Sequence, residues 1–469
     1  MADGMTLLTP ESIARHPSCV GRRAAALALL AVLAAGCARG EEVTFVQREF
    51  APGANTAAAA SADAPATEGG LLPVAGGAPS GTASAPAGGT TGRGAANAAA
   101  PPGGGVIRLG TVLPLQGGQR DFGEPILRTT QAFIDEVNAR GGVNGWRFEL
   151  VAYNACLVCQ GDALAAVRRL VEQDRVFAIV NTYVMVVAFE SVIPYLEQKG
   201  VPLIQGGSES QTSDALSPIN FATAPTGAFY GRFIPVMAKR YAGITRVGIT
   251  YLNVPAEAGG IDVLARELEK EGVEVVDRAP IEAAEEAVTS MDSVVARMRS
   301  RGADGVVATN PVLVIYGRLA ASRQGWSAPW VGPAAWSRLV EDSCGATCDD
   351  LVLTDTAGLS YPDRPTPQMR QFIDTMARRY PGADTTGHTL AAWVGMQLLS
   401  EGVARSGPDR RLFLQTVESF RNLDLGTTSP LSFSPDRHLG GSASILLRLK
   451  GGKYVRASDP LNFGEADVS

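Results

Sequence analysis

A regular alternation of apolar strands and amphipathic helices, beginning at Val106, constrains the fold more than any other feature of this 469-residue chain. Short apolar or alternating runs predict a first set of strands, at 106–112, 146–150, 176–180 and 201–204. A second set is predicted at 246–251, 273–276, 305–308 and 330–331. Because a strand, a helical crossover and a parallel strand make a doubly wound α/β unit, two such sets predict two α/β lobes.

Two local patterns refine this prediction. The helix expected after the first strand carries Pro125 near its first turn, where proline is tolerated, and Gly141-Gly142 ends it. Near the C-terminus, the apolar run Ile445–Leu449 is followed by Gly451-Gly452 and then by Tyr454-Val455. This order predicts a hairpin with a tight turn.

The segment before the first strand has a composition that opposes folding. Between Ala51 and Gly105, 47 of 55 residues are Ala, Gly, Pro, Ser or Thr. Such a stretch cannot bury enough apolar surface to offset its ordering entropy. We therefore predict a disordered tether over 37–105, and the 55-residue tract alone would have a root-mean-square reach of roughly 40 Å.

The first 36 residues have the features of a secretory signal. Arg22 and Arg23 precede the apolar run Ala24–Ala35, whose twelve residues are too few to span a bilayer. The run ends in Leu33-Ala-Ala-Gly-Cys37, which resembles a bacterial lipobox. We expect cleavage after residue 36, lipidation of Cys37, and an exported protein anchored in a membrane and facing the periplasm or the cell exterior. The alternative is an ordinary signal with a coincidental cysteine.

Charge and motif content argue against several classes of function. The net charge is −6, with 41 Lys and Arg against 47 Asp and Glu, so no nucleic-acid partner is expected. The sequence contains no P-loop, G-x-G-x-x-G, G-x-S-x-G or H-E-x-x-H motif. With three histidines in all, we expect no enzyme, no cofactor and no metal centre.

The cysteines allow more than one arrangement. Cys156 and Cys159 form a C-x-x-C pair just before a predicted helix, and Cys344 and Cys348 form a second close pair. Since exported thiols oxidise, two small-loop disulfides are the simplest expectation. A thiol–disulfide redox function of Cys156 and Cys159, or a four-cysteine zinc site, remain alternatives.

Several passages resemble the leucine/isoleucine/valine-binding protein family, the type I periplasmic substrate-binding proteins of ABC importers. Asp135-Glu-Val-Asn-Ala-Arg-Gly-Gly-Val-Asn-Gly145 matches the family's D-E-I-N-x-x-G-G-I-x-G pattern and is the most specific signal. The resemblance covers about residues 106–456. Weaker matches occur at Arg108–Gly117, Phe122-Gly123, Arg169–Asp174, Lys199–Ile204, Trp330–Pro333 and Ser434–Asp436.

The resemblance implies two α/β lobes joined by three crossover segments. Lobe 1 would comprise 106–226 and 362–430, lobe 2 would comprise 227–361 and 431–460, and 461–469 would be a tail. A small-molecule ligand would bind between the lobes, which close on it by a hinge motion and then present it to ABC permease subunits. We expect such a protein to act as a monomer.

Because ligands of such folds lie outside the carboxyl ends of the strands, the loops there supply the candidate ligand-binding residues. In lobe 1, the loop 181–185 has no serine where the family holds a ligand carboxylate. Glu209 is a further departure, since it would repel that carboxylate. The lobe 1 candidates are Gln116, Phe122, Thr182, Tyr183, Gly207, Ser208 and Glu209.

In lobe 2, Ala334 follows the strand after which amino-acid binders carry an acid for the ligand's ammonium group. Either Glu257 or Glu209 supplies that charge, or the ligand lacks an α-amino group. The ligand class therefore stays open between amino-acid-like, organic-acid and hydrophobic compounds. The remaining candidates are Glu257, Asn310, Ala334 and Trp336 in lobe 2 and His388 in lobe 1.

Two alternative functions belong to other classes. A ligand-sensing or structural lipoprotein would share the fold but contact a signalling partner or the envelope in place of a permease. A thiol–disulfide redox protein would depend on Cys156 and Cys159.

Overall fold

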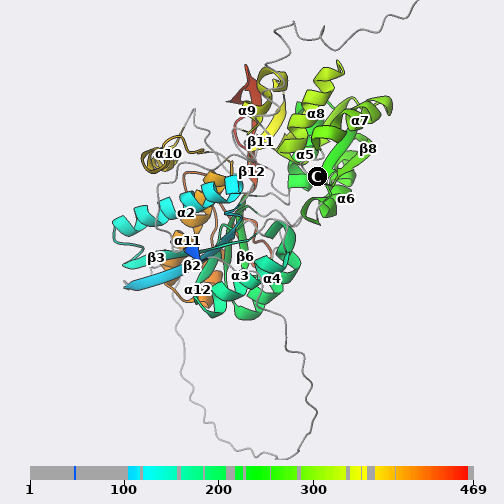
Figure 1. Cartoon of the computed structure of the whole chain (residues 1–469). Helices are drawn as coiled ribbons and strands as arrows, with labels where there is room; N and C mark the ends of the chain where they lie inside the picture. The colour runs from blue at the N-terminus through cyan, green and yellow to red at the C-terminus, as the bar shows by residue number, and fades with distance from the viewer. Residues whose placement is uncertain are drawn as a thin grey trace, which may run out of the picture.

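The computed structural model places the folded part of the chain in two lobes, each built on its own β-sheet (Figure 1). The described residues are 47–48, 104–116, 120–155, 160–182, 185–207, 217–224, 229–253, 255–282, 287–333, 339–349, 351–355, 365–385 and 387–462. The predicted α/β class with two lobes is confirmed.

The first sheet is wholly parallel and has the strand order β1-β3-β2-β4-β5-β6. Its strands are β1 (Gln47–Arg48), β2 (Gly105–Leu113), β3 (Trp146–Asn154), β4 (Ala178–Val180), β5 (Leu203–Gly207) and β6 (Asn220–Ala224). All residues of β4 and β6 are buried, as expected for parallel strands covered on both faces. One strand, β1, lies inside the segment predicted to be a disordered tether.

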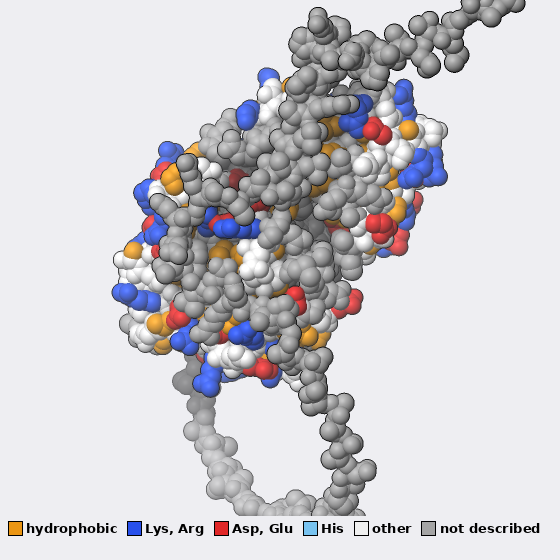
Figure 2. Space-filling view, viewed as in Figure 1, with side chains coloured by type: hydrophobic (Ala, Val, Ile, Leu, Met, Phe, Trp, Pro, Cys, Tyr) orange, Lys and Arg blue, Asp and Glu red, His pale blue; other side chains and the backbone are white. Residues whose placement is uncertain are grey.

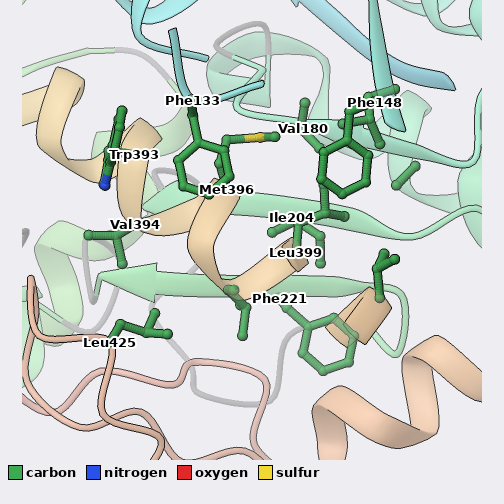
Figure 3. Close-up of a cluster of buried hydrophobic side chains, with 14 of the residues drawn as sticks. Phe133, Phe148, Val180, Ile204, Phe221, Trp393, Val394, Met396, Leu399 and Leu425 are labelled. Carbon is green, nitrogen blue, oxygen red and sulfur yellow. The ribbon is translucent and has the colours of Figure 1, made fainter. Parts of the chain in front are cut away.

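Helices from both ends of the chain cover this first sheet. They are α2 (Arg120–Ala139), α3 (Gln160–Glu172), α4 (Met185–Lys199), α10 (Pro367–Arg379), α11 (Gly387–Ser406) and α12 (Arg410–Glu418). The apolar stripe of α2 meets α11, where the rings of Phe133 and Trp393 stand edge to face with centroids 4.9 Å apart. Figure 3 shows this cluster, in which Val180, Met396 and Phe221 also take part.

The second sheet has the order β13-β12-β11-β10-β9-β7-β8, with β14 (Leu461–Asn462) pairing β12. Strands β7 (Arg246–Leu252) to β11 are parallel to one another, and β12 and β13 are added antiparallel. The predicted hairpin is confirmed, since Gly451 and Gly452 form its turn with φ of 58° and 72°. The other strands are β8 (Glu274–Ile281), β9 (Gly305–Ala308), β10 (Trp330–Pro333), β11 (Val352–Asp355), β12 (Ala443–Lys450) and β13 (Lys453–Arg456).

The helices of the second lobe all come from the middle of the chain. They are α5 (Phe229–Val236), the π-helix η3 (Met237–Tyr241), α6 (Pro255–Lys270), α7 (Ala287–Ser300), α8 (Pro311–Arg323), α9 (Leu339–Cys344) and the 3₁₀-helix η5 (Gly345–Cys348). Among the described residues, no helix is both long and apolar enough to cross a membrane.

The chain passes between the lobes after β6, after β11 and before β12. The third passage was expected at 430–431. Ala222 of β6 donates its N–H to the carbonyl oxygen of His438 (3.0 Å) and accepts from the N–H of Gly440 (2.9 Å), so this stretch still belongs to the first lobe. We therefore propose that the third crossing lies near 441–442 and not at 430–431.

Candidate functional site

The carboxyl ends of the parallel strands bring most of the described candidate residues to one edge of each sheet. Ligands of open α/β sheets bind outside such ends. Helix α4, which follows β4, contacts α6, which follows β7, so the lobes meet beside these ends. The candidate site is therefore the region between the strand ends of the two lobes.

In the second lobe, the carboxylate of Glu257 ties together the ends of β7 and β9. Its Oε2 accepts hydrogen bonds from the N–H of Leu252 (2.9 Å) and the hydroxyl of Thr309 (2.6 Å). Its Oε1 accepts one from Nδ2 of Asn310 (3.2 Å). Glu257 and Asn310, two separate candidates from the sequence, are thus direct neighbours.

The charge of this carboxylate is not balanced by a cation in the part of the chain that the structure describes. Burial raises the pKa of Glu257, and only the neutral donors Thr309, Leu252 and Asn310 oppose this effect. Asn310 also caps α8, since its side-chain oxygen accepts from the N–H of Val312 (3.0 Å). A carboxylate held by neutral donors can still accept a hydrogen bond from a ligand.

In the first lobe, the hydroxyl of Thr182 at the end of β4 already has a hydrogen-bond partner within the protein. Thr182 is buried, and its hydroxyl donates to the carbonyl oxygen of Val112 (2.7 Å). The Thr182 hydroxyl therefore donates its hydrogen bond within the protein and cannot donate it to a ligand carboxylate at the same time. Its oxygen can still accept, so the structure favours an acceptor role for Thr182 over a donor role.

Asn181 is a residue whose role the sequence did not indicate. It adopts a left-handed conformation with φ of 46°, and its Nδ2 donates to Oγ1 of Thr130 (3.1 Å) and to the carbonyl oxygen of Ala392 (3.0 Å). It therefore links the end of β4 to α2 and α11. The sequence signal for it is an asparagine placed directly after the apolar run 176–180, because asparagine tolerates the left-handed conformation well.

Gln116 and Phe122 flank the loop after β2. Gln116 is exposed, and its Oε1 lies 3.5 Å from Nδ2 of Asn154. Asn154 in turn accepts from the N–H of Leu115 (2.7 Å), which fixes the start of the loop. Phe122 is half-buried in the first turn of α2.

His388 stands in the first turn of α11, close to the end of β5. A Cβ added to Gly206 would lie 2.2 Å from the carbonyl oxygen of Ala391, so strand and helix are in backbone contact there. His388 precedes Ala391 by one turn and so lies toward the carboxyl end of the strand. Burial lowers the pKa of His388 to about 4, which makes the imidazole neutral at physiological pH.

Of the other residues singled out in the sequence, the structure describes only some. The backbone of Gly207 ends β5. In the second lobe, the sulfur atoms of Cys344 and Cys348 lie at bonding distance, with Cα atoms 5.6 Å apart. Tyr183, Ser208, Glu209, Ala334, Trp336, Cys37, Cys156 and Cys159 lie outside the described residues.

A basic hollow of about 420 Å³ lies at the opposite end of the first sheet and includes Arg108, Arg175 and Arg410. The Arg410 guanidinium donates to the carbonyl oxygens of Phe177 (2.9 Å) and Val176 (2.6 Å), so it anchors the backbone before β4. Burial lowers its pKa. Elsewhere, on the face in Figure 2, basic and acidic side chains are interspersed over the described surface. Arg410 therefore has backbone partners within the protein, and the hollow lies away from the strand ends of the candidate site.

Comparison with protein families gives a match over most of the described residues. The model of the periplasmic binding protein family matches residues 106–453. Among curated proteins, the chain is 23% identical over 328 residues to Leu/Ile/Val-binding protein homolog 7 of Brucella suis, covering 65% of this chain and 79% of that protein. It is 25% identical over 339 residues to homolog 8 of Brucella abortus, covering 68% and 81%.

Solved structures give the same architecture at low sequence identity. The branched-chain amino acid transporter substrate-binding protein LivJ of Streptococcus pneumoniae, in complex with isoleucine, has a TM-score of 0.64 and 18% identity, covering 76% of this chain and all (100%) of that one. A solute-binding protein of an ABC transporter from R. palustris, in complex with 4-hydroxybenzoate, has a TM-score of 0.63 and 16% identity, covering 76% and 98%. These likenesses concern the fold.

Proposed function

Because the chain belongs to the periplasmic binding protein family, we propose that it is the lipid-anchored solute-binding protein of an ABC importer and captures an amino-acid-like ligand between its lobes. The protein is a solute-binding protein of the ABC-transporter type and not an enzyme, which argues against a redox function of Cys156 and Cys159. Capture proceeds by closure of the two lobes on one small molecule.

The observation that carries the proposal is the half-buried Glu257 at the strand ends of the second lobe, whose carboxylate accepts three hydrogen bonds from neutral donors. Its neighbours Thr309 and Asn310 donate hydrogen bonds to it but leave its negative charge unbalanced. A ligand ammonium group would supply the missing counter-charge. Glu257 would then replace the acid that amino-acid binders carry at the position of Ala334.

A ligand with a carboxylate alone is the less favourable alternative. It would meet repulsion from Glu257 unless that side chain were protonated. The relative bound to 4-hydroxybenzoate makes this alternative worth testing directly. In the first lobe, the first-turn N–H groups of α11 and the loop after β5 are the candidates for holding a ligand carboxylate.

A thermal-shift screen of amino acids, their amides and deaminated analogues, and benzoates tests the proposal. A true ligand at about 100 times its dissociation constant stabilises the fold by about 2.7 kcal/mol. We expect stabilisation by a compound with an α-amino group and none by its deaminated analogue.

Two variants sharpen this screen. Glu257→Gln should weaken binding of the amino compound at least tenfold. Glu274→Gln, an exposed acid at the amino end of β8 that pairs with Arg246, is the matched control and should leave affinity unchanged. A benzoate that stabilises the protein while every amino compound fails would overturn the assigned ligand class. No shift with any compound would count against solute capture itself.

A further inference from the structure

The two-residue strand β1 places part of the N-terminal segment against the folded first lobe. Gln47 and Arg48 pair in parallel with the outer side of β3, with Cα partners Ala152 and Tyr153. They are separated from β2 by the long tract of small residues. The chain thus touches the first sheet once before that tract and returns to it afterwards.

The local sequence supports a strand at this place independently of the pairing. Residues 41–50 read Glu-Glu-Val-Thr-Phe-Val-Gln-Arg-Glu-Phe, an island rich in β-branched and aromatic residues. Such residues favour strands, whereas the following tract from Ala51 consists almost entirely of small residues and proline.

The sheet also has a physical reason to accept this strand. In the observed order, β3 would be an edge strand of nine residues if β1 were absent. Exposed edges carry unpaired N–H and C=O groups that promote pairing with other chains, and folded proteins commonly cover them. A strand from the same chain covers part of this edge at Ala152 and Tyr153.

We propose that the segment around Gln47 and Arg48 is a docked edge strand of the first lobe, so that the chain available to separate this lobe from the lipid anchor ends at Gln47 and not at Gly105. The effective leash is then the stretch from Cys37 to Gln47, which spans at most about 34 Å when fully extended. An undocked chain from Cys37 to Gly105 would have a root-mean-square reach of roughly 45 Å and a far longer maximum.

Docking also determines which part of the lobe stays near the anchor. Ala152 and Tyr153 lie near the carboxyl end of β3, the same end of the sheet that carries the candidate ligand site. A short tether from Cys37 to Gln47, attached at this end of β3, would keep the ligand-binding edge near the membrane. This consequence rests on the proposed lipid anchor, whereas the docking itself does not.

Hydrogen exchange on the detergent-solubilised mature chain tests the docking. The variant Gln47→Pro/Arg48→Pro removes both amide donors of β1, and Ala57→Pro/Ala58→Pro makes the same change within the small-residue tract. We expect backbone amides on the outer side of β3, around Ala152, to exchange at least tenfold faster in the first variant and unchanged in the second. Ligand affinity should be unchanged in both.

Equal exchange in the two variants would overturn the proposal. Loss of protection on simple dilution would also overturn it, because the strand would then come from a second copy of the chain. Since protection is measured without ligand and without a membrane, failure of the proposed transport function would not change the result.

Discussion

At the scale of single residues, burial acts on Glu257 and His388 in opposite directions. It raises the pKa of the acid and lowers that of the imidazole, because it disfavours the charged form of each. The sequence identified both residues through their place after strands or at a helix start. It could not identify Thr309, because its role depends on β9 lying next to β7. Nor could it show that the Thr182 hydroxyl is used by Val112.

Acidification from neutral pH toward pH 4 should destabilise the protein through His388. Its pKa is about 4 in the folded chain and about 6.5 when unfolded, so the unfolded state binds the proton first. The contribution of His388 to stability is therefore complete above the unfolded pKa and is lost as the pH falls toward the folded one.

Urea denaturation across this pH range, compared between the wild type and His388→Gln, measures that effect. Other groups titrate equally in both proteins, so the difference between the two curves isolates His388. We expect a shallower loss of stability in the variant. Parallel curves would contradict the assignment of a strongly lowered pKa.

At the scale of elements, periodicity predicted strands and helices well but missed their ends and one strand. Helix α2 begins at Arg120, so Pro125 lies just after its first turn. The added turn is supported by Glu124, which pairs with Arg120 and with Arg128 one turn away on either side. Strand β1 was missed because its short pattern directly precedes the small-residue tract and was included with it in the predicted tether 37–105. The proposed shift of the third crossing rests on the pairing of residues 438–440 with β6, a contact between segments distant in sequence.

The contact between β5 and α11 gives a prediction at this scale. Gly206→Ala would place its Cβ 2.2 Å from the carbonyl oxygen of Ala391 and push α11 away from the sheet. We expect a loss of stability of about 1–3 kcal/mol or more, since backbone cannot yield as a side chain does. Gly259→Ala in α6, where a Cβ meets nothing within 4 Å, is the matched control.

Chemical denaturation of the two variants separates packing from helix propensity. Gly259→Ala should stabilise the protein by about 0.5–1 kcal/mol, because alanine is the better helix former. If Gly206→Ala proved neutral, the close approach of α11 to β5 would be wrong, and with it the position of His388.

At the scale of the whole molecule, the proposed anchor is tested by changing one residue. Cys37→Ser should abolish incorporation of radiolabelled fatty acid and move the protein from the membrane fraction to the soluble extracytoplasmic fraction. Ligand affinity should not change, because Cys37 precedes the described strands of both sheets. Cys344→Ser, in the second lobe, is the control and should remain membrane-bound. Continued membrane association of Cys37→Ser would contradict the lipid anchor.

The first lobe is completed by the last third of the chain. Its core joins Ile107 and Phe133 to Trp393, Phe413 and Phe433, which follow the whole second lobe except its final hairpin. Contacts between residues so far apart in sequence form slowly, because the entropy cost of closing a long loop comes before the contacts stabilise the chain. During synthesis, the early α/β half therefore lacks the helices that cover one face of its sheet. If the N-terminal segment is the export signal we propose, a precursor that crosses a membrane unfolded would benefit from this delay, because the first lobe cannot finish folding until almost the entire polypeptide has been made.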